Sequence, residues 1–455
     1  MKLDYIEIGT SDFDALVEKH EGNGISIEPL KFYLDALPKK ENNIKINAAV
    51  SNFIGKIKVY YIHPNDIKNY NLPSWVRGCN SISEPHPQII NLLNEMGIQD
   101  IFKYDEIDVI NWDKLIKDHN ITQVNLLKID TEGHDHIIIE DILNSNTNIL
   151  PKVIFFETNV LTSDEIKEKT LTKLFKRGYK LIEKNNENTK VELSTNLPQK
   201  IIFTSNDSSY LDFWKVNSEI CSKVLKITPV LLHITNEDSD FYWDDYGLVK
   251  KIKNKLENTI LESQVVRLYS GTYFENEIII ISDIDMLLFD KKFLENSLKN
   301  SQFYDVTILG SDAYDKNRPE CEQFLHGGVE RFAMSYLIMK GEVLNKIMNI
   351  TKNENFLDFF IKNNFNYNWD SDEVIFTKNL LRSDFKINRI LRGFKSRFYL
   401  KDRIEKHMFT NNDYWKLNLN EITDLNGFIE CHCANYKDNE KTILRIRDII
   451  LNDFT

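Results

Sequence analysis

The chain has 455 residues, which is too many for one hydrophobic core, so two or three domains are expected. Its 57 basic and 69 acidic residues give a formal net charge of −12, which disfavours sequence-independent nucleic-acid binding. Apolar runs such as Ile278–Ile281 are far shorter than the roughly 20 residues that a bilayer requires, so no membrane span is expected. The five cysteines argue against a disulfide framework, and the acidic N-terminal stretch argues against a signal peptide, so we expect a cytoplasmic protein.

Short apolar runs alternate with helical stretches in the first part of the chain. Buried strands are predicted at Tyr5–Ile8, Gly24–Ile27, Ile44–Val50, Val124–Ile129 and Val153–Glu157. Helices are predicted at Phe13–Lys19, His136–Leu143 and Ser163–Lys176, and a closing hairpin at Tyr179–Ile182 and Thr189–Leu193. This alternation predicts an α/β domain with a mostly parallel sheet.

A polar, turn-rich stretch over Asn185–Gln199 divides the chain into predicted domains at 1–197 and 198–455. The second part also mixes both element types. Strands are predicted at Lys200–Thr204, Val230–Ile234, Glu277–Ser282 and Val306–Leu309, and helices at Leu248–Glu262 and Lys291–Leu298. Both domains are therefore expected to be α/β.

The tips of the first two strands suggest a cofactor site, because ligands of open α/β sheets bind beyond the carboxyl ends of the strands. Gly9 follows the first strand, and Glu28 ends the second about twenty residues later, where an acidic side chain accepts both ribose hydroxyls. Ser11 and Asp14 stand where a dinucleotide site has glycines, and Asp12 makes the loop more acidic. The loop therefore suits S-adenosylmethionine, which has a ribose and a sulfonium but no phosphate. A strand cap with a surface glutamate is the alternative.

Charged side chains are dense after the fourth strand. Asp130, Glu132 and His134 follow Val124–Ile129 directly, and the next strand ends in Glu157. An ordinary surface turn rarely carries so many charges, so these residues favour a functional site.

These segments occur in the order seen in FkbM-type methyltransferases. The matching motifs are Glu7-Ile8-Gly9, Ile27-Glu28-Pro29, Asn47-Ala48-Ala49-Val50-Ser51, Gly78-Cys79-Asn80-Ser81, Leu127-Lys128-Ile129-Asp130-Thr131-Glu132-Gly133, Phe155-Phe156-Glu157 and Arg177-Gly178-Tyr179. Residues 3–183 thus resemble that family. The resemblance implies a class I, Rossmann-like fold that binds S-adenosylmethionine and methylates a hydroxyl, often on a sugar. By matching position it implies cofactor-binding residues Glu7, Gly9, Ser11, Glu28 and Ala49.

The resemblance also places Asp130, Glu132 and His134 toward the acceptor. Removal of a hydroxyl proton requires a base within hydrogen-bond reach. His134 is one candidate, although nearby carboxylates are expected to raise its pKa and leave less neutral imidazole; Asp130 and Glu132 are equal candidates. A solvated loop histidine is the alternative for His134. The polar and aromatic stretch Trp75–His86 suits a sugar ring, and a surface loop is its alternative.

A second site is predicted where the strand Glu277–Ser282 runs into Asp283 and Asp285. Residues i and i+2 of an extended chain project to the same side, so both carboxylates can meet one Mn²⁺ or Mg²⁺ ion. Such an ion would neutralise a diphosphate leaving group. The pattern resembles the D-x-D motif of GT-A glycosyltransferases, which implies a nucleotide-sugar donor and makes His432 a candidate third metal ligand.

Asp372 and Glu373 precede the predicted helix Val374–Leu381. Acidic residues at a helix start are ordinarily capping residues, and the functional alternative makes Asp372 or Glu373 an acceptor-binding or basic group. His326-Gly327-Gly328 is either a loop near the donor or a simple turn.

The leading hypothesis is a bifunctional glycan-modifying enzyme, an O-methyltransferase fused to a glycosyltransferase that acts on the same oligosaccharide. One alternative is a methyltransferase with a non-catalytic, substrate-binding C-terminal domain. Another is a catalytically inactive carbohydrate-binding protein. The sequence does not reveal the oligomeric state.

Overall fold

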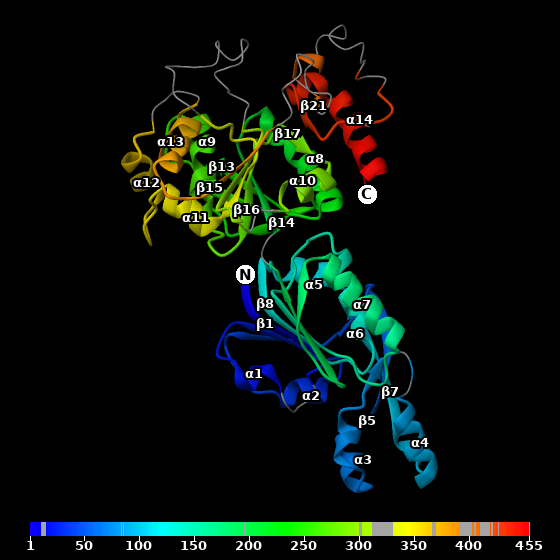
Figure 1. Ribbon diagram of the computed structural model, residues 1–455. Helices are drawn as coiled ribbons and strands as arrows, with labels where there is room; N and C mark the ends of the chain where they lie inside the picture. The colour runs from blue at the N-terminus through cyan, green and yellow to red at the C-terminus, as the bar shows by residue number, and fades with distance from the viewer. Residues whose placement is uncertain are drawn as a thin grey trace. The chain divides into compact units, whose positions relative to one another are not determined.

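The computed structural model describes residues 1–10, 15–82, 84, 86–194, 197–299, 303–311, 331–365, 370–391, 403–404, 406–409, 419, 422–425 and 427–454 (Figure 1). The chain divides into two compact units, Met1–Ser194 and Thr195–Thr455. Both units mix helices and strands, which confirms the predicted α/β class. The predicted residues Ser11 and His326-Gly327-Gly328 lie outside the described residues. In the described part of the chain, no helix is long and apolar enough to cross a membrane.

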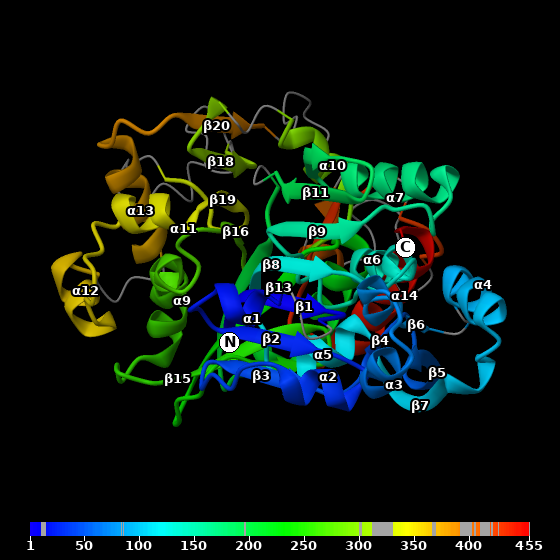
Figure 2. The same ribbon diagram turned by 90° about the horizontal axis from the view of Figure 1, so that it is seen from below.

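Unit 1 is built on a seven-stranded sheet in the order β10-β11-β9-β8-β1-β2-β3, and Figure 2 shows β9, β8, β1, β2 and β3 next to one another in this order. Its strands are β1 (Lys2–Ile8), β2 (Gly24–Ile27), β3 (Asn43–Ile46), β8 (Gln123–Ile129), β9 (Val153–Glu157), β10 (Tyr179–Lys184) and β11 (Asn188–Leu193). Five consecutive strands of this sheet, β9, β8, β1, β2 and β3, are parallel to one another. Strand β11 runs antiparallel to both of its neighbours. The chain order reverses at β1, which pairs with β2 on one side and β8 on the other. In open sheets such a reversal opens a crevice at the carboxyl ends of the strands.

Helices cover both faces of this sheet. The helices are α1 (Leu16–Lys19), α2 (Lys31–Ala36), α5 (Trp112–Asp118), α6 (Asp135–Asn144) and α7 (Asp164–Lys176). In Figure 1, α1 and α2 lie on one face, and α5, α6 and α7 on the other. Tyr5 of β1 packs with Val17 and Leu34 in the apolar cluster under α1 and α2. Apolar residues on alternate sides of β1 thus bury both faces, as expected of a parallel strand.

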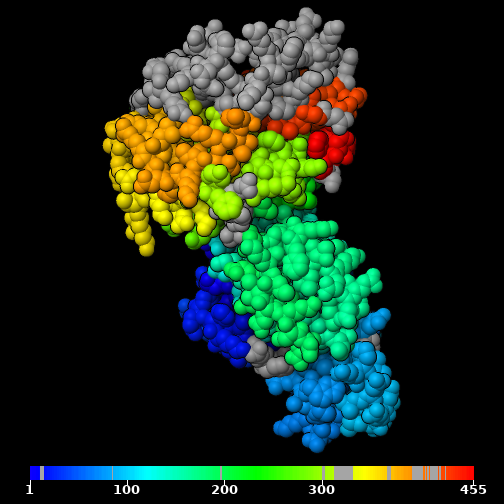
Figure 3. All heavy atoms as spheres, in the orientation of Figure 1, coloured from blue at the N-terminus to red at the C-terminus, as the bar shows by residue number. Residues whose placement is uncertain are grey.

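An insertion between β3 and α5 forms a second sheet that the sequence did not predict. The single strand predicted at Ile44–Val50 is wrong, because Asn43–Ile46 belongs to the first sheet and Ala49–Val50 to the second. Its strands, in the order β4-β7-β5-β6, are β4 (Ala49–Val50), β7 (Phe102–Ile110), β5 (Gly55–Ile62) and β6 (Ser81–Ile82). Helices α3 (Pro64–Asn69) and α4 (Pro87–Met96) enclose a small apolar cluster that includes Leu72, Ile89 and Leu93. The insertion stands out as a separate lobe of unit 1 in Figure 3.

Unit 2 contains an eight-stranded sheet, in the order β14-β15-β13-β12-β16-β19-β18-β20, and a three-stranded sheet, β17-β22-β21. The strands are β12 (Lys200–Asn206), β13 (Thr228–Thr235), β14 (Tyr242–Asp244), β15 (Gly247–Lys253), β16 (Ile278–Ile281), β17 (Met286–Leu288), β18 (Val306–Leu309), β19 (Leu337–Lys340), β20 (Ile387–Ile390), β21 (Arg403–Ile404) and β22 (Glu430–His432). The helices are α8 (Phe213–Ile220), α9 (Thr259–Tyr269), α10 (Lys291–Ser297), α11 (Gly341–Ile347), α12 (Phe356–Lys362), α13 (Ser371–Leu381) and α14 (Tyr436–Phe454). Apolar side chains of the large sheet supply a core on each of its faces.

The predicted helix at Leu248–Glu262 is wrong except over its last four residues, 259–262. Residues Gly247–Lys253 form strand β15, which pairs in parallel with β13 and places Leu248 opposite Val230. Helix α9 begins only after Asn258, whose side chain accepts a hydrogen bond from the backbone N–H of Leu261. Apolar residues in short runs fit both helical and strand spacing, and pairing with β13 decides between them here.

Candidate functional site

A cavity of ≈ 240 Å³ lies at the strand ends of unit 1. The residues that line it are Ile8, Gly9, Thr10, Glu28, Pro29, Ala48, Ala49, Val50, Val59, Gly78, Asn80, Ile82, Asp130, Thr131, Glu132 and Glu157. They come from the ends of β1, β2, β8 and β9 and from the insertion. The cavity therefore occupies the position that the reversal of chain order predicts for a ligand.

Gly9 allows the first strand end to approach the β8 end closely. Its φ of +77° is in the left-handed region, and a Cβ built there would lie 1.9 Å from the carbonyl oxygen of Asp130. The backbone N–H of Asp130 donates to the carbonyl of Ile8 at 3.0 Å, which fixes this approach. A glycine is thus required by the neighbouring strand end as well as by the turn.

Glu28 lies at the tip of β2, where its side chain is 3% exposed and lines the cavity. Its Oε1 accepts a hydrogen bond from the backbone N–H of Leu30 at 2.9 Å. The side chain of Asn47 donates to the carbonyl of Glu28 at 3.0 Å and to that of Pro29 at 2.7 Å. These contacts hold the carboxylate at the cavity wall, where it can accept hydrogen bonds from ligand hydroxyls.

Glu7 was also predicted to bind the cofactor, but its side chain is buried and is not among the residues that line the cavity. Glu7 is fully buried; its Oε1 accepts from the ammonium of Lys128 at 3.0 Å, and its Oε2 from the backbone N–H of Leu16 at 2.7 Å. Burial raises the pKa of Glu7, and Lys128 opposes that rise. Because Glu7 and Lys128 are each the last residue but one of their strands and lie opposite one another, this ion pair ties the ends of β1 and β8 together.

The loop after β8 is anchored by Asp135. Its Oδ2 accepts hydrogen bonds from the hydroxyl of Thr131 at 2.6 Å and from the backbone N–H of Thr131 at 3.2 Å. Its Oδ1 accepts from the backbone N–H of Glu157 at 2.9 Å. This buried carboxylate, whose pKa burial raises to about 6, thus fixes the β8 loop against the β9 end and sets the positions of Asp130 and Glu132.

The cavity is strongly acidic. Glu28, Asp130, Glu132 and Glu157 all line it, and the described lining residues include no Lys, Arg or His. Burial, together with the charges of Glu132 and Asp130, raises the pKa of Glu157 to about 9. A cationic ligand would relieve this repulsion, whereas a pyrophosphate would increase it.

The surroundings and the pKa of His134 differ from those that the sequence predicted. Its Nε2 lies 3.0 Å from the hydroxyl of Ser51, and the residues that line the cavity do not include it. Burial, with a smaller contribution from His136, lowers the pKa of His134 to about 4, so the expected increase caused by neighbouring carboxylates is wrong. Burial removes water from around the charged imidazolium and so disfavours it.

Three residues of the predicted polar and aromatic stretch, Gly78, Asn80 and Ile82, line the cavity. His86 is not a lining residue, but its Nε2 lies 3.6 Å from Oε2 of Glu132, which is. Trp75, by contrast, is 45% exposed. Sequence reasoning missed the packing of the insertion against the strand ends, since the intervening β5–β7 pairing is long-range.

In unit 2, the pairing of β17 with β22 brings His432 close to Asp285. Met286 and His432 are opposite one another, and Nε2 of His432 lies 3.6 Å from Oδ2 of Asp285. The ammonium of Lys406 lies 2.5 Å from the same oxygen. Although burial opposes it, the hydrogen bond and charge of His432, with those of Lys406, lower the pKa of Asp285 to about 2.

Asp283 and Asp372 share one cation, Arg267. The guanidinium pairs with Asp283 through Nη1, and its Nε donates to Oδ2 of Asp372 at 2.8 Å. Asp372 is 1% exposed, and burial raises its pKa. Asp372 is thus paired with Arg267 in the interior of unit 2. Burial and the charges of Asp372 and Asp283 also raise the pKa of the neighbouring Glu373 to about 8.

The three predicted metal ligands of unit 2 fit a hard cation in kind, but the two aspartates carry basic partners here. Asp283 pairs with Arg267, and Asp285 with Lys406. Among the described residues, the set of potential ligands within 4.8 Å of one another is instead Asp130, Glu132 and Glu157 of unit 1. Cation binding in unit 2 therefore requires the basic side chains to move away from the carboxylates.

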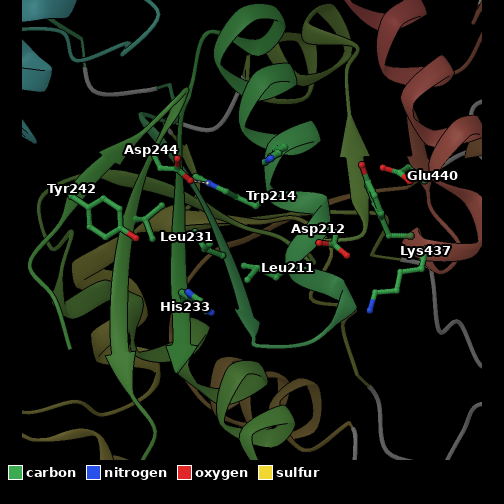
Figure 4. A pocket seen from close by; sticks show the side chains of 12 residues that line it. Leu211, Asp212, Trp214, Leu231, His233, Tyr242, Asp244, Lys437 and Glu440 are labelled. Atoms are coloured by element: carbon green, nitrogen blue, oxygen red, sulfur yellow. Dashed lines mark hydrogen bonds between the residues drawn. The ribbon is translucent and has the colours of Figure 1, made fainter. Parts of the chain in front are cut away.

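A larger cavity of ≈ 520 Å³ lies elsewhere in unit 2. It is lined by Leu211, Asp212, Trp214, Lys215, Leu231, His233, Tyr242, Asp244, Val249, Tyr436, Lys437 and Glu440. Figure 4 shows the Trp214 indole directed at Asp244, to which its Nε1 donates at 3.0 Å, with Tyr242 and Lys437 at opposite sides. Aromatic rings beside charged groups suit a sugar-like ligand. Its lining residues do not include Asp283, Asp285 or His432.

Comparisons with known proteins give one family match, within the first part of the chain, and several similar solved structures. Residues 7–181 match the family model of the Methyltransferase FkbM domain, which confirms the resemblance of the first part of the chain. No curated protein matches the chain. Similar solved structures are glycosyltransferases. They include galactosyltransferase LgtC with donor and acceptor sugar analogues (12% identity, 56% of this chain and 96% of that chain, TM-score 0.31). They also include GlyE of Streptococcus pneumoniae TIGR4 (11% identity, 56% and 62%, TM-score 0.32) and the bifunctional WbbM (9% identity, 64% and 57%, TM-score 0.30).

Proposed function

We propose that unit 1 is an S-adenosylmethionine-dependent O-methyltransferase that acts on a sugar hydroxyl. The observation that carries the proposal is the cavity at the strand ends, which is lined by Glu28 and the carboxylates of the β8 and β9 ends. When bound, S-adenosylmethionine supplies an activated methyl group with a positive charge on sulfur. Four carboxylates and no described basic side chain at the wall suit that charge.

The residues of the cavity have separate roles in this proposal. Glu28, already oriented by Leu30, accepts hydrogen bonds from the ribose hydroxyls. Ala49 leaves room beside it because its side chain is only a methyl group. Glu7 supports the site indirectly through Lys128, so it positions the strand ends.

Asp130 and Glu132 line the other part of the cavity, and we assign them to the acceptor. Carboxylates there can orient a sugar hydroxyl and accept its proton, since both lie on the loop that Asp135 fixes. His134 is neutral at pH 7, but its Nε2 is engaged with Ser51. The carboxylates are therefore the better candidates for the base.

For unit 2 we propose metal-dependent glycosyl transfer from a nucleotide sugar, so that the whole chain modifies one glycan acceptor. The supporting observation is that β17 and β22 bring His432 to Asp285, two residues after Asp283. Carboxylate oxygens and an imidazole suit Mn²⁺, and the ion would neutralise a departing diphosphate. The aromatic cavity of Figure 4 offers a sugar-binding surface in the same unit. A non-catalytic, substrate-binding unit 2 is the second candidate.

A thermal-shift panel with the full chain tests both parts. S-adenosylhomocysteine at about 100 times its dissociation constant should stabilise unit 1 by about 2.7 kcal/mol. A nucleotide sugar should raise the unit 2 midpoint only with Mn²⁺, and Asp285→Asn should remove that increase. No shift with S-adenosylhomocysteine would refute the methyltransferase proposal, and a metal-independent sugar shift would favour the substrate-binding role of unit 2.

A further inference from the structure

Three carboxylates meet at the acceptor end of the unit 1 cavity. Asp130, Glu132 and Glu157 each offer an oxygen, and these oxygens all lie within 4.8 Å of one another. Asp130 is exposed, whereas Glu132 and Glu157 are half-buried. Like charges at this spacing repel one another, and a cation among the three carboxylates would relieve that repulsion.

The backbone holds the three carboxylates together. Glu132 has a φ of +51° and Gly133 a φ of +93°, so the loop turns back at the end of β8. Asp135 then ties this loop to the backbone N–H of Glu157. The carboxylates thus belong to one fixed loop and one neighbouring strand end, which gives a preformed ligand set.

A buried imidazole lies next to the carboxylates. His86 is 3% exposed, and its Nε2 faces Oε2 of Glu132 at 3.6 Å, too long for a hydrogen bond. In the described part of the chain, Nδ1 of His86 and Oε2 of Glu157 are buried and have no hydrogen-bond partner. Buried polar atoms without partners are costly, and a cation among the carboxylates would give Oε2 of Glu157 a partner, with Nε2 of His86 facing the same group.

We propose that Asp130, Glu132 and Glu157 bind one divalent cation, Mg²⁺ or Mn²⁺, and that His86 orients Glu132 or completes the ligand set. Hard cations of this class prefer carboxylate oxygens, and an imidazole adjoining a ligating carboxylate is a common outer partner. This site is separate from the predicted metal site of unit 2.

The role of the ion rests on the proposed function of the same cavity. A cation at the acceptor end would hold a sugar through its oxygens and lower the pKa of the hydroxyl to be methylated. Asp130 and Glu132 would then act on the acceptor mainly through the ion. Vicinal hydroxyls are the acceptor class that such an ion selects, because two adjacent oxygens can occupy two of its positions.

The test is a Mn²⁺ titration of the full, EDTA-treated chain, with free Mn²⁺ followed by electron paramagnetic resonance. We expect Glu157→Gln and Glu132→Gln each to bind one fewer Mn²⁺ per chain, or to bind it at least about tenfold more weakly, than wild type. Glu168→Gln is the matched control, since Glu168 is an exposed acid on α7 whose partner is Lys184. Circular dichroism shows which variants are folded, and either folded variant gives the test.

Equal Mn²⁺ stoichiometry and affinity in wild type and in these variants would overturn the proposal. Calorimetry with S-adenosylhomocysteine on the same samples keeps the two proposals apart. Binding of S-adenosylhomocysteine without a Glu157-dependent Mn²⁺ site would refute the cation site alone. A Glu157-dependent Mn²⁺ site in a chain that does not bind S-adenosylhomocysteine would support the cation site and refute the proposed methyl transfer.

Discussion

Replacement of Gly9 by alanine should destabilise unit 1 and disrupt its cavity. The new Cβ would lie 1.9 Å from the carbonyl oxygen of Asp130, a backbone atom that the hydrogen bond to Ile8 holds in place. Overpacking of this kind costs about 1–3 kcal/mol, and the left-handed φ of +77° adds roughly 1–2 kcal/mol for a residue with a side chain. We therefore expect Gly9→Ala to lower the free energy of unfolding by about 2–5 kcal/mol.

Gly97→Ala provides the matched control. Gly97 also has a left-handed φ, +68°, at the C-terminus of α4, but a Cβ there would meet nothing within 4 Å. Its replacement should cost only the conformational part, about 1–2 kcal/mol.

Differential scanning calorimetry of the full chain measures both variants. At about 2–4 °C per kcal/mol for a domain of this size, Gly9→Ala should lower the unit 1 midpoint by roughly 4–20 °C. Gly97→Ala should lower it by roughly 2–8 °C. Equal shifts for the two variants would refute the steric reasoning about the strand ends.

Three further predictions concern buried charges. Lys128→Met should lower the free energy of unfolding of unit 1, measured in urea, by about 3–5 kcal/mol, because Glu7 stays buried without its cation. The double variant with Glu7→Gln should recover part of that loss. No recovery would contradict the pairing. Burial raises the pKa of Asp141 to about 6, so its contribution to stability is lost as the pH rises from about 4 through 6. Asp141→Asn should therefore gain about 1 kcal/mol relative to wild type between pH 4 and pH 7, after allowance for solvent screening; a constant difference would contradict this. Arg267→Met should destabilise unit 2 by about 3–5 kcal/mol because Asp372 remains buried, and a stability equal to wild type would show that the pair is unimportant.

The sequence predicted the sheet of unit 1 well because its strands carry continuous apolar runs. Strands β2 and β9 have the predicted bounds, and the hairpin of β10 and β11 is longer than predicted. Gly9, Glu28 and Ala49 were assigned to the cofactor, and all three line one cavity. These residues converge because parallel strands end at one edge of the sheet, and the alternation of strands and helices along the chain already predicts a parallel sheet.

The parts that the sequence did not predict depend on long-range contacts. Nothing local distinguishes Glu7, which pairs with Lys128 inside the sheet, from Glu28, which lines the cavity. The lowered pKa of His134 likewise depends on burial, which becomes apparent only after the insertion is packed. In unit 2, Arg267 lies far in sequence from Asp372, so their ion pair leaves no local pattern.

Isothermal titration calorimetry of S-adenosylmethionine into the full chain, wild type and Glu28→Gln, tests the central claim most directly. The glutamine can still accept the hydrogen bond from Leu30, but it presents an amide donor where the ribose hydroxyls need an acceptor. Loss of charge-assisted hydrogen bonds, at about 1.5–3 kcal/mol, predicts affinity lower by roughly 10- to 100-fold. Equal affinity in the two proteins, or no binding to the wild type, would contradict the account.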